Sequence, residues 1–465
     1  MSIYLIPPEI LSDIFRRTLS SDHDDNPISS NTGPMLLIQV CRTWRHVAVS
    51  DSSLWSSLRI NVSHATGMNH PCIVELWLKR SAFQPLTITV WIDPFSHLNR
   101  EAREIVQTIL HMLSNVSERW VRLSMTLPAS NRLFAEFCSS QAPNLELLSF
   151  KIGNWSMEEA QSINTLLRHA PALRTLQWSN RCSWGSWDAP FDSGMQHLRV
   201  SWANLTDILL DTWITLKTAL EILQRCDNLV NLDLRHFSYN PELLFEPNNS
   251  ISSQQGPALH DRLPYTHLPY LESLTIYQLK LDEGLSLLME RIFVPKLIHF
   301  NFTCGFIDHV KWPQASFHNL ITRSASHLQS LMLEYTGISQ DQLIQCLQDC
   351  STSLRRLEVY DARGDICVGD TLLEMLRAQT LPDPFTYHAT LCNNLTTLIL
   401  HRVVECTDGA LAQTLESRTS ISLSDQKQQR CAPLRHADII FSKCFFKTNQ
   451  LDLHYLESSF PKSAE

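Results

Sequence analysis

Glycine is scarce in this chain of 465 residues, which contains only 12 of them. The nearest pair, Gly364 and Gly369, stands five positions apart, which excludes the Gly-x-Gly-x-x-Gly dinucleotide motif, and no Gly-x-x-x-x-Gly-Lys sequence of a phosphate-binding P-loop is present. A Gly-x-Ser-x-Gly nucleophile elbow is absent as well. Cys-x-x-Cys and His-Glu-x-x-His are also missing, which removes the common zinc patterns. We therefore expect no enzyme activity, no catalytic residue, no cofactor and no metal site.

Long hydrophobic runs and a basic N-terminus are lacking too. No apolar stretch approaches the roughly 18 residues of a membrane span, and Glu9 and Asp13 stand where a secretory signal would be basic. The formal net charge of -9 argues against a broad nucleic-acid surface. The 13 cysteines, an odd number without a secretion signal, indicate reduced thiols. These features predict a cytoplasmic or nuclear protein with no membrane and no nucleic-acid partner.

A recurring phrase is the strongest positive feature of the sequence. Leu-x-x-Leu-x-Leu, or a close apolar variant, opens ten segments: Leu145–Phe150, Leu173–Trp178, Leu205–Leu210, Leu229–Leu234, Leu271–Ile276, Leu297–Phe302, Leu328–Leu333, Leu354–Val359, Leu395–Leu400 and Leu434–Ile439. The first leucines of neighbouring segments are 24 residues apart at least (Leu205 to Leu229) and 42 at most (Leu229 to Leu271). Periods in this range are typical of stacked repeats.

The segment from Leu328 to Cys350 is the clearest repeat. Its leucines predict a short strand, and Gly337 allows a turn after it. Ser339, with Gln342 three residues later, predicts a capped helix that ends near Cys350. A strand followed by a helix, repeated along the chain, predicts an α/β fold with a parallel sheet and helices on one of its faces.

This pattern resembles the leucine-rich-repeat family in its long, irregular form, which implies a parallel sheet on the concave face and helices on the convex face. The family's usual Asn after the strand is missing, so we expect an irregular arc. Weaker, degenerate repeats are expected before Leu145. Their predicted strands are Leu58–Ile60, Pro85–Ile92 and Val121–Leu127, and their predicted helices are Ile73–Lys79 and Ala102–Leu113. The polar stretches Phe245–Pro264 and Leu381–Thr390 are expected to be surface loops or disordered insertions.

The first sixty residues lack the repeat phrase and predict short helices instead. Pro7 and Pro8 precede an apolar helical face that includes Ile10 and Ile14. A second helix is expected to start at Pro34 and to carry Leu37, Val40, Cys41, Trp44, Val47 and Ala48 on one side. About fifty residues cannot bury this much apolar surface alone, so part of it must pack on the repeats or on another protein.

The ordered pieces Ile6–Leu11, Ile14-Phe15, Val40–Trp44 and Leu54-Trp55 resemble the F-box. Together with the repeats, they resemble the F-box/leucine-rich-repeat proteins abundant in mushroom-forming fungi. The resemblance implies binding to a Skp1-like adaptor, and through it to a cullin ubiquitin ligase, by Pro7, Ile10, Leu11, Ile14, Val40, Cys41 and Trp44. One departure is the stretch Thr18–Gly33, which is longer than the family's link and is expected to be a polar loop. The alternative is that these helices only cap the repeats.

The outward-facing strand positions are where a target protein would bind. In a strand written L1-x2-x3-L4-x5-L6-x7, positions x3, x5 and x7 point away from the helices. Exposed aromatic and apolar groups there single out Tyr277, Met332, Tyr360 and Ile399 as candidate target-binding residues. The predicted organisation is a helical F-box domain over residues 1–58, a leucine-rich-repeat solenoid over 59–450 and a tail over 451–465.

The sequence thus predicts a substrate-receptor adaptor of a Skp1–cullin–F-box ubiquitin ligase that presents an unknown target protein for ubiquitin-dependent degradation. The alternative is a leucine-rich-repeat scaffold that binds a partner without any ligase.

Overall fold

A computed structural model describes residues 6–19, 33–62, 70–92, 99–127, 141–152, 157–179, 195, 198–239, 263–278, 283–305, 312–325, 327–361, 366–378, 390–419, 431–441 and 449–460. The chain divides into two compact units. The N-terminal unit is Met1–Ile214 and the C-terminal unit is Thr215–Glu465. Most of the polar stretches around residues 18–33, 245–264 and 381–390 lie outside the described residues.

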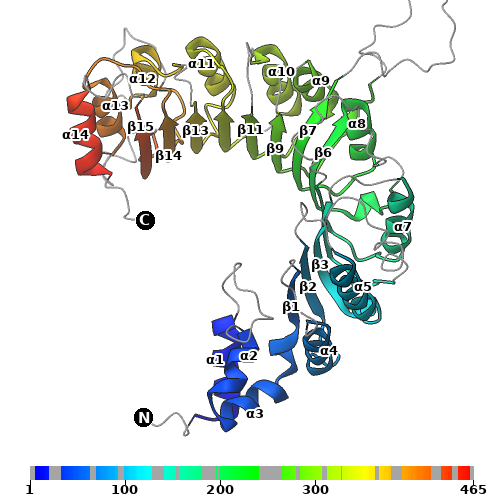
Figure 1. The fold of residues 1–465 in the computed structure, drawn as a ribbon. Coiled ribbons are helices and arrows are strands. Elements are labelled where there is room, and N and C mark those ends of the chain that lie inside the picture. Colours follow the sequence, from blue (N-terminus) through cyan, green and yellow to red (C-terminus); the bar gives the residue numbers. More distant parts are fainter. Residues whose placement is uncertain are drawn as a thin grey trace, which may run out of the picture. The chain divides into compact units, whose positions relative to one another are not determined.

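The N-terminal unit begins with helices and continues with strands that pair in parallel. Its elements are α1 (Pro8–Leu19), α2 (Gly33–Val40), α3 (Arg42–Ser50), η2 (Ser52–Trp55), β1 (Ser57–Val62), α4 (His70–Arg80), β2 (Leu86–Ile92), α5 (Arg100–Ser114), η3 (Ser117–Arg119), β3 (Trp120–Leu127), β4 (Leu147–Ile152), α7 (Met157–Arg168), β5 (Thr175–Ser179), η5 (Trp202–Asn204) and β6 (Asp207–Thr215). Strands β1 to β6 are hydrogen-bonded in chain order. Helices α4 and α5 lie along one side of β1–β3 (Figure 1).

The C-terminal unit repeats the strand-then-helix order. Its elements are α8 (Leu216–Leu223), β7 (Asn231–Ser238), β8 (Thr266–His267), β9 (Ser273–Gln278), α9 (Gly284–Arg291), β10 (Ile292–Phe293), β11 (His299–Cys304), α10 (Gln314–Ser324), β12 (Ser330–Glu334), α11 (Gln340–Asp349), β13 (Arg356–Tyr360), α12 (Asp370–Leu376), β14 (Thr397–His401), α13 (Ala410–Thr419), β15 (His436–Ile440) and α14 (Gln450–Ser459). Strands β7, β9 and β11–β15 form a parallel sheet, and helices α9–α13 cover one of its faces (Figure 1).

The α/β architecture predicted from the repeat phrase is therefore confirmed. Each of the ten predicted segments contains a strand, and the three earlier strands and two earlier helices are present as β1, β2, β3, α4 and α5. The outward-facing x7 positions also line up across the sheet of the C-terminal unit. Tyr277 pairs with Thr303, which is followed across the sheet by Glu334, Tyr360, His401 and Ile440.

A repeated backbone arrangement joins neighbouring strands. The carbonyl oxygen of Glu272 accepts the N–H groups of Ile298 and His299 at 2.8 and 2.9 Å, and equivalent pairs of hydrogen bonds recur at β12, β13, β14 and β15. Three repeats have a residue with positive φ at or just after the strand: His236 (60°) within β7, Tyr335 (54°) after β12 and Arg402 (63°) after β14. Each of these residues is the eighth of its repeat, counted from the first leucine, so the left-handed backbone recurs at the same repeat position.

The C-terminal end of the chain differs from the predicted tail. Residues Gln450–Ser459 form α14, which packs on α13. Asp452 is fully buried and accepts a hydrogen bond from the Ala412 N–H at 2.7 Å. The Asn449 side chain also donates to Asp452, at 3.0 Å. Helix α14 therefore covers the helix of the last described repeat.

Two of the cysteines that precede strand leucines, Cys226 and Cys392, lie in tight turns. Cys226 and Cys392 are buried, and their carbonyl oxygens accept hydrogen bonds from Leu229 N and Leu395 N at 3.4 and 3.0 Å. Burial raises the pKa of both thiols to about 12. Cys431 differs, because it is only half-buried. None of the cysteines that the structure describes forms a disulfide.

We expect iodoacetamide to modify the exposed Cys72 in the folded protein and to leave Cys226 and Cys392 unmodified until the chain is denatured. The reason is that the thiolate is the reactive form and burial suppresses it. Mass spectrometry of peptides labelled before and after denaturation gives the comparison. Rapid native labelling of Cys392 would contradict its place in a closed turn.

Candidate functional site

The N-terminal helices form a small bundle of three helices, α1, α2 and α3, where the sequence predicted two. The single second helix expected from Pro34 is broken into α2 and α3 at Cys41, whose backbone is extended at φ -158° and ψ 173°. The Cys41 sulfur accepts a hydrogen bond from the Trp44 N–H at 3.4 Å and thereby caps α3. The one-sided helix predicted from Leu37 to Ala48 was therefore wrong, because Cys41 redirects the chain.

Four of the residues predicted to bind the adaptor are exposed. Pro7 is exposed, as are Ile10 (54%), Ile14 (41%) and Val40 (53%). Leu36 on α2 is a further exposed apolar residue, at 46%. We call Ile10, Ile14, Leu36 and Val40 the apolar helix patch. Large apolar side chains exposed together on one small helical unit are typical of a protein-binding surface.

The other three predicted adaptor-binding residues have mainly internal roles. Leu11 is only 2% exposed and belongs to the core of the bundle, so it is not accessible at the surface of the free chain. It lies one residue after Ile10, and this step along α1 turns its side chain toward the interior. Cys41 and Trp44 are half-buried. The Trp44 ring meets the buried Phe15 edge-on at a centroid distance of 4.8 Å.

Trp55 anchors the helices to the first repeat of the same unit. It is completely buried, and its indole N–H donates to the Ala48 carbonyl at 2.7 Å. Its ring meets Trp77 of α4 edge-on at 4.9 Å, and the Arg80 guanidinium lies 4.4 Å from its centroid. Trp55 thus links the end of α3, the start of β1 and α4 through one side chain.

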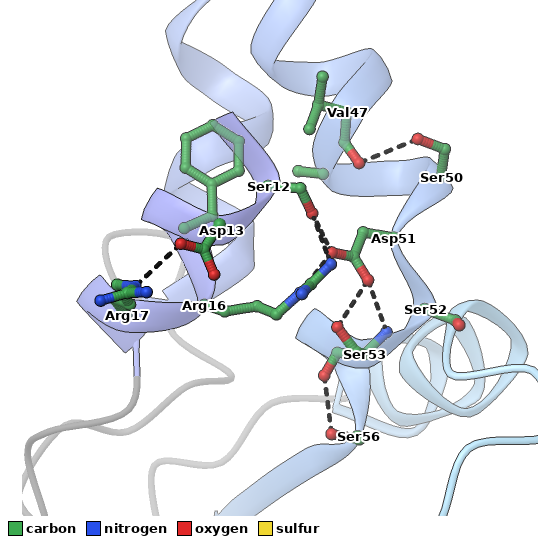
Figure 2. A network of polar contacts seen from close by, with 12 residues as sticks. Ser12, Asp13, Arg16, Arg17, Val47, Ser50, Asp51, Ser52, Ser53 and Ser56 are labelled. Carbon is green, nitrogen blue, oxygen red and sulfur yellow. Dashed lines mark hydrogen bonds and ion pairs between the residues drawn. The ribbon is translucent and has the colours of Figure 1, made fainter. Parts of the chain in front are cut away.

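Asp51 makes a second connection, which Figure 2 shows as a polar network. Its carboxylate accepts hydrogen bonds from Ser12 on α1 and from the N–H and Oγ of Ser53, the latter two at 3.0 and 2.6 Å. Arg16 Nε lies 3.0 Å from the same carboxylate. Burial acts to raise the pKa of Asp51, but the bonds from Ser12, Ser53 and Arg16 outweigh it and hold that pKa below its ordinary value. Asp51 therefore ties α1 to the residues that lead into β1.

Asp51→Asn should lower the stability of the N-terminal unit by about 1–2 kcal/mol at neutral pH. Because the folded-state pKa is depressed, the contribution of the carboxylate is fully present above its unfolded pKa of about 3.9 and is lost as the pH falls through the folded-state pKa. Thermal melts of both proteins from neutral to acid pH should therefore converge. A difference that stays constant down to acid pH would show that the carboxylate charge does not stabilise α1.

The predicted target-binding residues lie on the face of the C-terminal sheet away from the helices. The side chains of β11 alternate between the two faces of the sheet. The ring centroid of Phe300 lies 5.5 Å from that of Phe317 on α10, whereas Asn301 and Thr303 stand on the opposite side. Tyr277, Met332 and Tyr360 are partly exposed on that opposite face. Ile399 is only 7% exposed, so its predicted exposure is wrong. Its neighbours across the sheet, Glu358 and Asp438, flank it on both sides.

Polar groups on this face largely satisfy one another. The Tyr360 hydroxyl donates to Glu358 at 2.6 Å, and Arg356 pairs with the same carboxylate. Burial and the Glu358 carboxylate raise the pKa of Tyr360. Asp438 bonds His401 at 2.9 Å, and farther along the sheet Arg235 bonds Asp233 at 2.6 and 2.9 Å. The face therefore presents internally paired charges around two half-exposed tyrosine rings.

Sequence reasoning missed an exposed tryptophan. Trp91 on β2 is 40% exposed, although its strand neighbours Val90 and Ile92 are buried. The outward-facing positions x3, x5 and x7 were defined only for strands that carry the repeat phrase, the first of which is Leu145–Phe150, so the three earlier strands were omitted. The period-2 alternation of residues 85–92 was the signal that could have found it, since it puts Trp91 on the face opposite Val90 and Ile92.

Nothing in the described part of the chain points to a metal or a membrane. No group of three or more His, Cys, Asp or Glu side chains among the described residues could hold a metal ion. Cys346 and Cys350 instead donate their S–H groups to the Gln314 side chain and the Cys346 carbonyl, at 3.2 and 3.1 Å. No described helix has the length and hydrophobicity needed to span a bilayer. Comparison with known proteins found neither a family model nor a curated protein that matches the sequence.

Proposed function

We propose that this chain is a substrate-receptor adaptor of a Skp1–cullin–F-box ubiquitin ligase, acting in the cytoplasm or nucleus. The observation that carries the proposal is the apolar helix patch, in which Ile10, Ile14, Leu36 and Val40 stay exposed on α1 and α2 of a bundle that Trp55 anchors through α3. A plain cap would bury these side chains against the repeats. Their exposure favours a partner protein that covers them.

In this proposal the chain itself performs no chemistry. The N-terminal helices bind the Skp1-like adaptor, and the leucine-rich repeats bind a target protein on the face of the sheet away from the helices. Tyr277, Met332 and Tyr360 are the candidate contacts on the C-terminal sheet, and Ile399 would support them from beneath rather than touch the target. The chain accelerates ubiquitin transfer because it holds the lysines of the target near the enzyme that carries ubiquitin. This raises the effective concentration of those lysines.

Affinity purification with and without proteasome inhibition tests the proposal. The wild-type chain should recover a Skp1-like adaptor and a cullin in both conditions, and its target should accumulate only under inhibition. Recovery of a stable partner without the adaptor and cullin would instead favour the repeat scaffold that has no ligase role.

A further inference from the structure

The first four strands of the N-terminal unit carry an unusual set of outward-facing side chains. The inward positions, such as Leu58, Ile88 and Leu123, are completely buried. The outward positions, in strand order, are Ser57, Arg59 and Asn61; Thr87, Thr89 and Trp91; Arg122, Ser124 and Thr126; and Leu147, Ser149 and Lys151. We call these twelve residues the basic sheet face. They comprise three cations, one exposed indole, one leucine and seven small polar residues, and they include no acid.

Trp91 is the natural anchor of this face. At 40% exposure its ring is open to solvent, and its cross-strand neighbours are the smaller Asn61 and Thr126. Tryptophan is strongly enriched among residues that dominate binding energy, because its large ring buries much apolar area at low entropic cost. A ring standing above small polar neighbours can be covered by a partner side chain without rearrangement of the sheet.

The charged residues of the basic sheet face are all positive. Lys151 lies two strands away in the same row, since Trp91 pairs with Thr126 and Thr126 with Lys151, which corresponds to about 10 Å. Arg122 lies on the strand between them, at the other end of the face. Neither Arg122 nor Lys151 forms an ion pair with any residue that the structure describes. Both are exposed. Among the described residues, therefore, no acid neutralises these two charges.

The sheet of the C-terminal unit provides a contrast within the same chain. There Arg235 pairs with Asp233, and Arg356 pairs with Glu358. Charges that are already paired gain little from a new partner, because the existing interaction must first be broken. The formal net charge of the chain is -9, whereas the basic sheet face carries three cations and no acid. The sign of the charge on this face is therefore opposite to that of the chain as a whole.

We propose that the basic sheet face binds an acidic segment of the target protein, with Trp91 covered by an apolar side chain and Arg122 and Lys151 paired with carboxylates. The inference rests on the proposed function only in assigning the segment to the target. Strands β2 and β3 are hydrogen-bonded on both sides, so contact there must come from side chains rather than from an added strand. Four strands at about 4.8 Å spacing accommodate a short segment rather than a globular surface.

A protein segment fits these observations better than a nucleic acid. Single-stranded nucleic acids bind to platforms where successive bases stack on several aromatic rings. The basic sheet face offers one exposed ring, and the chain as a whole would repel a polyanion. An acidic peptide needs only local charge complementarity and one apolar contact.

Calorimetric titration of the purified full-length chain tests the inference. The probes are a glutamate-rich peptide with a central leucine, the same peptide with glutamine in place of glutamate, and a single-stranded oligonucleotide. We expect the acidic peptide to bind at least about tenfold more tightly than its glutamine counterpart. Lys151→Glu and Arg122→Glu should each weaken it by about tenfold. Trp91→Ala should weaken it by about 30-fold.

Arg355→Glu is the matched control, because it makes the same charge change at an exposed position of the C-terminal unit. It should leave peptide affinity almost unchanged. The proposal is overturned if neither peptide binds, if both bind equally, or if Trp91→Ala and Lys151→Glu bind like wild type. Tighter binding of the oligonucleotide would assign the face to nucleic acid instead. Skp1 binding by the same variants, measured separately, should persist, so that failure of this surface and failure of the ligase role give different results.

Discussion

Ile14→Lys should abolish binding of the Skp1-like adaptor while leaving the chain folded. Ile14 is 41% exposed in the apolar helix patch, so a lysine there can extend into solvent in the free protein. In the complex the same lysine would be buried without a partner charge, and the cost of an unpaired buried charge is several kcal/mol. We expect an affinity loss of about 100-fold or more, equivalent to about 2.7 kcal/mol. Ile10→Lys should act in the same way.

The exposure of Ile14 makes this variant a cleaner test than truncation of Trp44. Because the Trp44 ring packs on Phe15, its loss would disturb the bundle as well as any interface. Thr43→Lys is the matched control, since Thr43 is an exposed polar residue on α3 and receives the same charge. Binding by the Thr43 variant should remain near wild type. Equal binding by Ile14→Lys and wild type, with unchanged circular dichroism, would rule out the apolar helix patch as the adaptor site.

Trp55→Ala should produce the largest loss of stability in the N-terminal unit. Truncating a completely buried tryptophan costs about 3–5 kcal/mol, and here it also removes the contact with Trp77 and the hydrogen bond to Ala48. Hydrogen exchange should accelerate in α3 and β1 together, because this side chain joins them. Exchange in the C-terminal unit should be unchanged.

Trp55→Phe separates packing from hydrogen bonding. Phenylalanine keeps much of the contact with Trp77 but leaves the Ala48 carbonyl without its donor, so we expect an intermediate loss of about 1–3 kcal/mol. If Trp55→Ala left the exchange rates of α3 and β1 at wild-type values, the anchoring role of Trp55 would be wrong.

The outward-facing strand positions were predictable because the geometry of a strand leaves little freedom in the direction of its side chains. Side chains alternate between faces, so the leucines that must be buried also place Tyr277, Met332 and Tyr360 on the opposite side. The prediction that Ile399 is exposed was wrong for a different reason. Its accessibility depends on the lengths of Glu358 and Asp438 on the neighbouring strands, and alternation within one strand says nothing about cross-strand cover.

The N-terminal helices were less predictable because their details depend on tertiary contacts. The F-box resemblance named Ile10 and Leu11 together, but one helix step separates the exposed Ile10 from the buried Leu11. The break at Cys41 was also missed, since a cysteine sulfur that caps a helix has no strong sequence signal. The Asp51 network joins residues 39 positions apart in the chain, from Ser12 to Asp51, and no local pattern predicts it.

Calorimetry with the purified full-length chain and a purified Skp1-like adaptor tests the central claim most directly. The proposed function predicts a one-to-one complex with a Kd of about 1 μM or tighter, close to −8 kcal/mol, and loss of that complex on Ile14→Lys but not on Thr43→Lys. Absence of binding by the folded wild-type chain at adaptor concentrations of about 100 μM would contradict it.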